Sequence, residues 1–279
     1  MTTLQLSRNA TRSPRNNTLL LLGVLLLLVV ATVVMTSVLK RPSAPLNEAQ
    51  IAAFLRDDAD PSGIVHALSQ VRTRVGQGER LDRWAPELMR LSSHPAEEVR
   101  HATAELMGLD PSRPEFRQKL LEMLRSQTVL VRNTAALSLA AFGDNAGREM
   151  IVNMLEPIRV DAPTPGHVET VARPGRHIDH GEVLVRLHSG NSVFNVLAPV
   201  SGHIRAMAVE NGDMVSGGSR IAVIEPGADE LLAALRALER IGKPQDLTAI
   251  AALAANQGLP DAVREQAKAA ERKIRERSQ

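Results

Sequence analysis

The side chains best suited to metal chemistry are histidines, and most of them gather in one part of the chain. Five of the eight histidines lie within residues 158–226, namely His167, His177, His180, His188 and His203. A catalytic zinc ion takes three converging nitrogen or oxygen ligands and keeps a fourth position open. His177 and His180, with Asp179 between them, are the local group with suitable spacing. Exposure on strand edges explains such a scatter equally well, so we predict no metal site and keep His177 and His180 as candidate ligands.

Other catalytic chemistry has little support in the sequence. The chain has no cysteine, and its acidic runs, such as Asp57-Asp58 and Glu97-Glu98, stand near expected helix starts, where the helix dipole favours them. The glycine-rich stretch 215–220 lacks the lysine and the helix of a phosphate-binding loop. A net charge of +2 and 2% aromatic residues argue against nucleic-acid binding. We therefore predict no catalytic residue, no enzymatic activity and no nucleic-acid partner.

The histidine-rich stretch has the pattern of short strands and contains an internal duplication. Its branched apolar residues fall in short runs broken by Pro and Gly, which is typical of a small all-β domain. The two halves repeat the same residues at matching positions: Ala162 and Ala198, Gly166 and Gly202, Gly175 and Gly212, Gly181 and Gly218, Leu184 and Ile221. Two equivalent halves with glycines at the turns are expected.

Each half reads Ala-Pro-x-x-Gly-x-Val/Ile and then Gly-x-x-Val/Ile-x-x-Gly-x-x-Leu/Ile. This layout resembles the biotinyl/lipoyl domain family and its relatives in membrane-fusion proteins, the periplasmic adaptors of export pumps. The resemblance implies a barrel-sandwich fold and a hairpin between the halves, where carrier members hold a lysine that receives biotin or lipoate. In this sequence the matching position is Asn191 in the turn Ser189-Gly190-Asn191-Ser192.

No lysine occurs anywhere in residues 158–226. Because attachment of biotin or lipoate needs an amine nucleophile, we expect an unmodified domain without a cofactor. The turn formed by Ser189, Gly190, Asn191 and Ser192 is then a candidate for protein contact. Membrane-fusion adaptors commonly carry a long helical hairpin at this place, which the sequence lacks. The duplicated layout also resembles LytM-like zinc endopeptidases, although their His-x-His pair is missing here.

Helical periodicity flanks the β stretch and includes a short repeat. Val99-Arg100 and Val131-Arg132 lie one repeat apart, and Val263-Arg264 falls close to two further repeats on once residues 158–226 are removed. The pattern resembles HEAT repeats, which implies stacked helices and a surface for protein contacts. Arg100, Arg132 and Arg264 are repeat positions, with a structural role preferred over binding.

Residues 18–39 are free of charge and long enough for a membrane span, which needs about 20 apolar residues. We predict a transmembrane helix with a cytoplasmic N-terminus and the bulk of the chain in the bacterial periplasm. The fold class is multidomain: a cytoplasmic tail (1–17), a transmembrane helix (18–39), a linker (40–48), HEAT-like helical repeats (49–157), an inserted all-β lipoyl/biotinyl-like barrel sandwich (158–226) and C-terminal HEAT-like helices (227–279).

Taken together, these features predict a membrane-anchored, non-enzymatic scaffold or adaptor at the inner membrane. Its partners would be the lipid bilayer, through residues 18–39, and a protein complex for transport or envelope assembly. The alternatives are a membrane-tethered biotin or lipoate carrier and a zinc-dependent, peptidoglycan hydrolase-like module.

Overall fold

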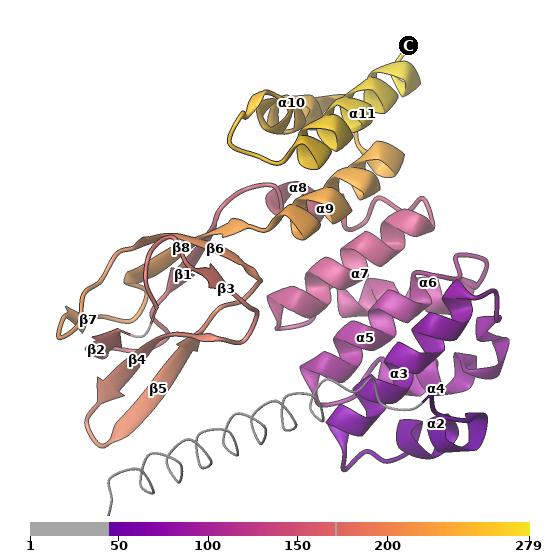
Figure 1. Cartoon of the computed structure of the whole chain (residues 1–279), viewed down its shortest axis with the longest axis horizontal. Coiled ribbons are helices and arrows are strands. Elements are labelled where there is room, and N and C mark those ends of the chain that lie inside the picture. Colours follow the sequence, from indigo (N-terminus) through magenta and orange to yellow (C-terminus); the bar gives the residue numbers. More distant parts are fainter. Residues whose placement is uncertain (1–44, 171) are drawn as a thin grey trace, which may run out of the picture. The chain divides into compact units, whose positions relative to one another are not determined.

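Helices lie on both sides of a single β module along the chain (Figure 1). The structure is a computed structural model that describes residues 45–170 and 172–279. Before the module come α2 (Glu48–Leu55), α3 (Pro61–Gly76), α4 (Ala85–Leu91), α5 (Glu97–Met107), α6 (Pro114–Met123), α7 (Val129–Ala141) and α8 (Arg148–Asn153). After it come α9 (Ala228–Ile241), α10 (Leu247–Ala255) and α11 (Asp261–Arg277). Short 3-10 turns, η1 (Leu81–Arg83) and η2 (Pro244–Asp246), precede α4 and α10.

The first helices begin where the sequence supplies caps. The Asn47 side chain accepts a hydrogen bond from the amide of Gln50, whose own side chain bonds back to the Asn47 amide, so α2 opens with a capping box. Asp60 caps α3 through the amide of Gly63, and Pro61 occupies the first helical position, where a missing N–H costs nothing. These local signals fix the two helix starts.

From α3 to α11, every second helix packs against the one two places further along the chain. Contacts run from α3 to α5, from α5 to α7, from α7 to α9 and from α9 to α11, and Figure 1 shows α3, α5 and α7 side by side. Val99, Val131 and Val263 are completely buried in α5, α7 and α11. Gly108, at the end of α5, lies against Ser138 of α7, whose hydroxyl donates to the Ala104 carbonyl at 2.8 Å. Small residues therefore let these two helices approach closely.

The helices on either side of the β module share one hydrophobic core. Ile151 and Met154, before the module, pack in the same cluster as Leu231 and Leu235 of α9 and Ile274 of α11. A separate cluster holds α2 to α7 together, and a third belongs to the β module. The helical part of the chain thus continues across the module.

The β module consists of two four-stranded antiparallel sheets. One has the order β1-β8-β6-β3, from β1 (Ile158–Asp161), β8 (Arg220–Pro226), β6 (Gly202–Met207) and β3 (His177–Ile178). The other has the order β5-β4-β2-β7, from β5 (Ser192–Leu197), β4 (Val183–Ser189), β2 (Gly166–Thr170) and β7 (Met214–Val215). When each strand of the first half (β1 to β4) is exchanged with its counterpart in the second half (β5 to β8), the strand order of one sheet becomes that of the other. The predicted duplication is therefore confirmed.

The pairing at the sheet edges repeats this symmetry residue by residue. Gly166 of β2 lies opposite Val215 of β7, and Gly202 of β6 lies opposite Ile178 of β3. A Cβ atom on Gly166 would come within 2.9 Å of the His188 carbonyl oxygen, and one on Gly202 would collide with that of Glu225. Glycine is required at both places because a neighbouring backbone approaches closely.

The prediction of a transmembrane helix, and with it the fold class that included one, is contradicted. Within residues 45–170 and 172–279, no helix is long and apolar enough to cross a membrane. The longest one, α11, has 17 residues and carries many charges, whereas a span needs about 20 apolar residues. The predicted cytoplasmic tail and transmembrane segment, residues 1–17 and 18–39, lie outside the described residues. A single-pass inner-membrane protein with a periplasmic domain is therefore not supported.

Candidate functional site

The hairpin between the two halves of the β module ends in a tight two-residue turn. Ser189 and Ser192 are register partners, so Gly190 and Asn191 form the turn. Gly190 has φ of +59°, as expected for the first central residue of a type II′ turn. Asn191 follows it and is exposed. The predicted contact residues therefore stand together at the tip of the hairpin.

The hairpin also presents apolar side chains to solvent. Val193, Phe194 and Leu197 of β5 are 54%, 44% and 46% exposed. Within the described residues, β5 pairs with β4 alone and forms the edge of its sheet. Large apolar side chains on an unpaired edge strand are unusual, because such an edge can pair with another chain. Sequence analysis missed this feature, although Val193-Phe194 beside a polar turn was its signal.

A small network of charges accompanies the hairpin. Glu169 of β2 lies 2.9 Å from Arg186 and 3.0 Å from the Nε2 atom of His188, both on β4. The hydrogen bond from His188, followed by that from Arg186, lowers the pKa of the Glu169 carboxyl. These contacts bridge β2 and β4, so they hold the hairpin to its sheet.

A carrier site needs an amine at the hairpin tip, and the residues present do not fit one. The side-chain amide of Asn191 is not a nucleophile that can form the linkage to biotin or lipoate. The nearest basic side chains along the hairpin are Arg186 and His188, which are engaged with Glu169. The module therefore has the fold of a carrier domain but lacks the amine to which biotin or lipoate is attached.

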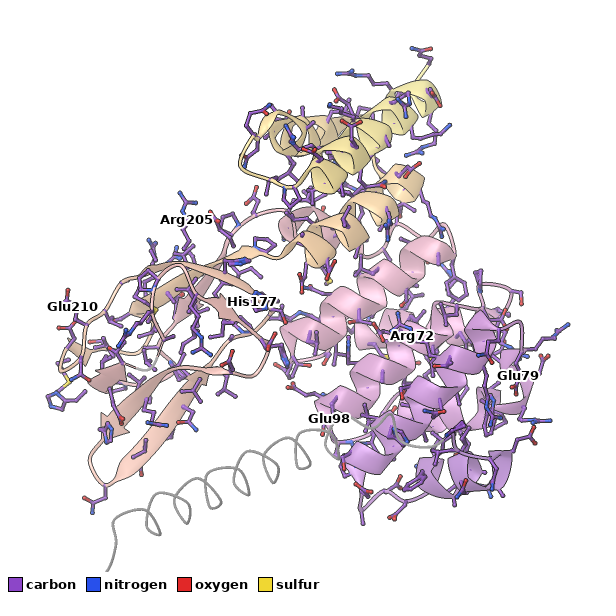
Figure 2. The ribbon with its side chains drawn as sticks, viewed as in Figure 1. Arg72, Glu79, Glu98, His177, Arg205 and Glu210 are labelled. Atoms are coloured by element: carbon purple, nitrogen blue, oxygen red, sulfur yellow. The ribbon has the colours of Figure 1, made fainter. Side chains whose placement is uncertain are left out.

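The structure separates the two predicted metal-ligand candidates. His177 stands on the exposed surface of the module (Figure 2), with its Nε2 atom 3.2 Å from Asp179. His180 faces Glu97 of α5, with 3.7 Å between its Nε2 atom and the carboxylate. Instead, His203 lies directly opposite His177 on the paired strand. In residues 45–170 and 172–279, no three histidine, aspartate or glutamate side chains are arranged to hold a metal ion.

The predicted repeat arginines bind the loops that precede their own helices. Arg100 donates to the carbonyl oxygens of His94 and Pro95 at 2.7 and 2.6 Å. Arg132 donates to the carbonyl oxygens of Ser126 and Gln127 at 2.7 and 2.9 Å.

The matching arginine of α11 has a different environment. Arg264 bonds the side chain of Gln257 at 2.7 Å and forms an ion pair with Asp261. Repeat arginines thus share one structural contact in α5 and α7 but not in α11.

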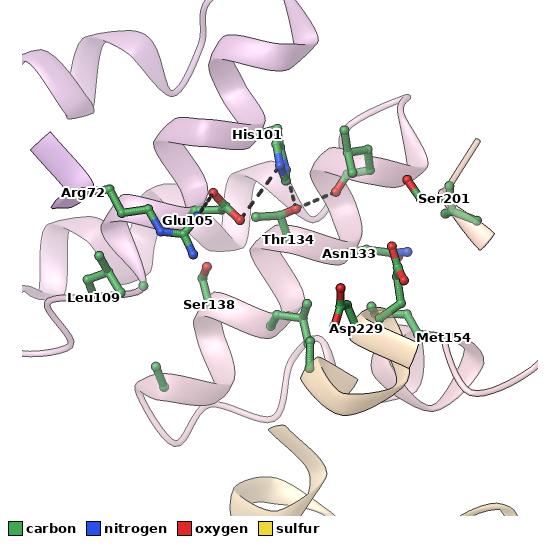
Figure 3. A pocket seen from close by; sticks show the side chains of 17 residues that line it. Arg72, His101, Glu105, Leu109, Asn133, Thr134, Ser138, Met154, Ser201 and Asp229 are labelled. Atoms are coloured by element: carbon green, nitrogen blue, oxygen red, sulfur yellow. Dashed lines mark hydrogen bonds and ion pairs between the residues drawn. The ribbon is translucent and has the colours of Figure 1, made fainter. Parts of the chain in front are cut away.

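A cavity of about 410 Å³ adjoins α5, α7 and the start of α9, and sequence analysis gave no sign of it (Figure 3). Arg72 and Glu105 form an ion pair of 2.7 Å in its wall. The Nδ1 atom of His101 lies 2.7 Å from the hydroxyl of Thr134. Burial lowers the pKa of His101 and so favours the neutral imidazole.

Comparison with known proteins identifies the β module. Residues 158–224 match the family model described as "Biotin-requiring enzyme". This part of the chain is a biotinyl/lipoyl domain, which confirms the resemblance seen in the sequence. The match does not extend to the helices, and it supports neither the membrane-fusion adaptor type nor the HEAT-like context. No curated protein matches the chain.

Two solved structures match short parts of the chain. Urea carboxylase of Kluyveromyces lactis shares 27% identity over 25% of this chain and 6% of its own, with a TM-score of 0.24. A single-chain, multi-domain long-chain acyl-CoA carboxylase shares 24% identity over 39% of this chain and 10% of its own, with a TM-score of 0.24. The chain therefore corresponds to only a small share of either protein.

Proposed function

We propose that this chain is a non-enzymatic scaffold or adaptor whose biotinyl/lipoyl domain works as a protein-contact module without a prosthetic group. The observation that carries the proposal is the hairpin tip. The position of the carrier lysine is an exposed asparagine, and residues 158–226 contain no lysine at all. A domain with this fold but without the attachment amine retains the protein-contact surface of a carrier domain. It cannot be joined to biotin or lipoate.

The contact surface in this proposal is the hairpin tip with β5. Val193 and Phe194 lie beside the polar turn, and the outer side of β5 has no strand partner within the described residues. An extended segment of a protein partner can add to such an edge through backbone hydrogen bonds, with apolar side chains giving specificity. The occupant we propose is therefore an extended, apolar strand of a partner protein.

The helices supply the second part of the proposal, a HEAT-like platform. Support comes from the successive packing of α3, α5, α7, α9 and α11 and from the repeated arginine contacts in α5 and α7. Stacked helical repeats offer extended surfaces to partners and need no catalytic centre. The β module interrupts this stack between α8 and α9, and the turn between β4 and β5 lies at the end of the module away from those helices (Figure 1).

Intact mass is the direct test against a carrier function. The full chain, purified from cells grown with biotin and lipoate, is expected to have the mass of the unmodified polypeptide. A biotinyl or lipoyl increment in the wild-type protein would establish the carrier alternative and overturn the proposal. A biotin-carrying protein from the same cells serves as the positive control for attachment.

Site-specific photocrosslinking tests the contact surface. A photoreactive phenylalanine analogue at position 194 is expected to crosslink one reproducible partner protein, whereas the same analogue at Arg205, on the other sheet, is not. Phe194→Ser should reduce co-purification of that partner at least about tenfold, and Phe194→Leu should retain it, because apolar contact is kept. Equal crosslinking from both positions would contradict docking at β5.

A further inference from the structure

Two histidines face each other across the edge of one sheet. His177 of β3 and His203 of β6 are register partners in an antiparallel pair. Their ring centroids are 5.1 Å apart, with an angle of 69° between the ring planes. Both side chains are exposed, while their neighbours Ile178 and Ile204 are fully buried beneath the sheet. The module's core therefore does not depend on either imidazole.

The spacing of these rings suits a shared metal ion. An ion bound by two imidazole nitrogens at about 2.0–2.1 Å, in adjacent tetragonal or tetrahedral positions, keeps the ring centroids roughly 4.5 to 5 Å apart. The observed separation of 5.1 Å has this size. Register partners on antiparallel strands also point to the same face of the sheet. The backbone pairing thus already provides the distance that a two-histidine site needs.

Each histidine of the pair has one carboxylate as a neighbour. The Oδ1 atom of Asp179 lies 3.2 Å from Nε2 of His177. A histidine that binds a metal through one ring nitrogen usually donates the other N–H to a carboxylate or carbonyl. Donation from Nε2 of His177 to Asp179 leaves the Nδ1 lone pair available. Glu225 of β8 is the register partner of His203 on its other side, and Arg205 lies 3.7 Å from the same carboxylate.

We propose that His177 and His203 together bind one divalent transition-metal ion, with Cu²⁺ held more tightly than Ni²⁺ or Zn²⁺. Imidazole suits all three ions, and Cu²⁺ binds most strongly in the usual order of affinities. Two protein nitrogens leave the remaining positions to water, so the ion exchanges freely. Asp179 acts as a positioning residue for the His177 ring. This site lies outside the proposed contact surface on β5 and does not depend on it.

Calorimetric titration of the full chain with CuCl₂ tests the proposal, using protein without a histidine tag. One Cu²⁺ ion is expected per chain at this site. His177→Ala and His203→Ala should each weaken its affinity at least about tenfold, and Asp179→Asn by a smaller factor. His180→Ala is the matched control, because it removes a nearby histidine that faces Glu97 instead, and it should leave the affinity unchanged.

Electron paramagnetic resonance gives a second readout that does not depend on stability. The wild-type Cu²⁺ spectrum should show coupling to two imidazole nitrogens, and either single variant should reduce it to one. Circular dichroism confirms that the variants remain folded. Unchanged affinity in both variants, loss of the ion with His167→Ala or His180→Ala instead, or no saturable binding at up to about 100 µM Cu²⁺ would each overturn the assignment.

Discussion

Arg148 of α8 and Asp246 of η2 form a buried ion pair, although 98 positions and the whole β module separate them in sequence. Their side chains are 9% and 3% exposed. Asp246 also accepts a hydrogen bond of 2.8 Å from the backbone amide of Lys243. The pair therefore joins the helices before the module to those after it, inside the core that they share.

Removing one partner of this pair should be costly. Arg148→Met leaves the Asp246 carboxylate buried without a counter-ion, and we expect a loss of about 3–5 kcal/mol in the free energy of unfolding. Arg148→Met with Asp246→Asn removes both charges, keeps the acceptor for Lys243 and should recover part of that loss. Urea unfolding followed by circular dichroism measures these two variants and the single variant Asp246→Asn. A double variant that loses the sum of the two single effects would show that the charges are not coupled.

The repeat arginines should differ in their contribution to stability. Arg100→Met and Arg132→Met each remove a cation that bonds two carbonyl oxygens of the preceding loop, at an expected cost of about 1–2 kcal/mol. Arg264→Met should cost less than about 1 kcal/mol, because the partner side chain of Asp261 is 87% exposed. Thermal unfolding of the three variants gives the comparison. Equal losses at all three positions would contradict the distinction between the helices.

Replacement of Gly202, where β6 lies beside β8, should destabilise the β module. Gly202→Ala places a methyl group against the backbone carbonyl of Glu225, and we expect a loss of about 1–3 kcal/mol from the β module. Gly166→Ala, at the equivalent position, should cost less because the carbonyl oxygen is 2.9 Å away. Gly76→Ala is the control, since its Cβ meets nothing within 4 Å and alanine favours the helix. Proteolysis or unfolding of the module reports the effect.

Acid should destabilise the helical part through His101. Burial lowers the pKa of this imidazole in the folded chain below its unfolded value of about 6.5. Its neutral form therefore contributes stability that is complete above the unfolded pKa and is lost as the pH falls through the folded pKa.

His101→Gln keeps a polar group near Thr134 but cannot be protonated, so the melting temperature should fall less between pH 7.5 and pH 5.5 than in the wild type. The control is His167→Gln on the exposed surface of the β module, which should follow the wild-type profile. A His101→Gln variant with an unaltered pH profile would assign the acid sensitivity to other groups.

Much of the β module could be predicted because its constraints are local and occur twice. Gly166 and Gly202 stand where a backbone carbonyl leaves no room for a Cβ atom. Both halves therefore need glycine at the same place, which makes the duplication visible in the sequence. The hairpin tip was also predicted, because Gly190 marks a tight turn between two apolar runs. Position 191 was predicted by comparison with the carrier family, and the structure places it in that turn.

Contacts between distant residues were not predictable in this way. The ion pair of Arg148 with Asp246 depends on how the helices before and after the module pack together. The spacing of apolar residues in the sequence does not indicate which charged residues meet there. His177 was paired with His180 because the two are close in sequence, whereas strand register brings His203 to it instead. The transmembrane prediction used hydropathy alone, and its residues lie outside the described part of the chain.

The chain enters and leaves the β module on neighbouring strands, since Ile158 of β1 is the register partner of Ile224 of β8. Cα atoms of such partners are about 5 Å apart, a gap that a bridge of one or two residues can close. The module could thus be acquired or discarded by a single genetic event without moving α8 or α9.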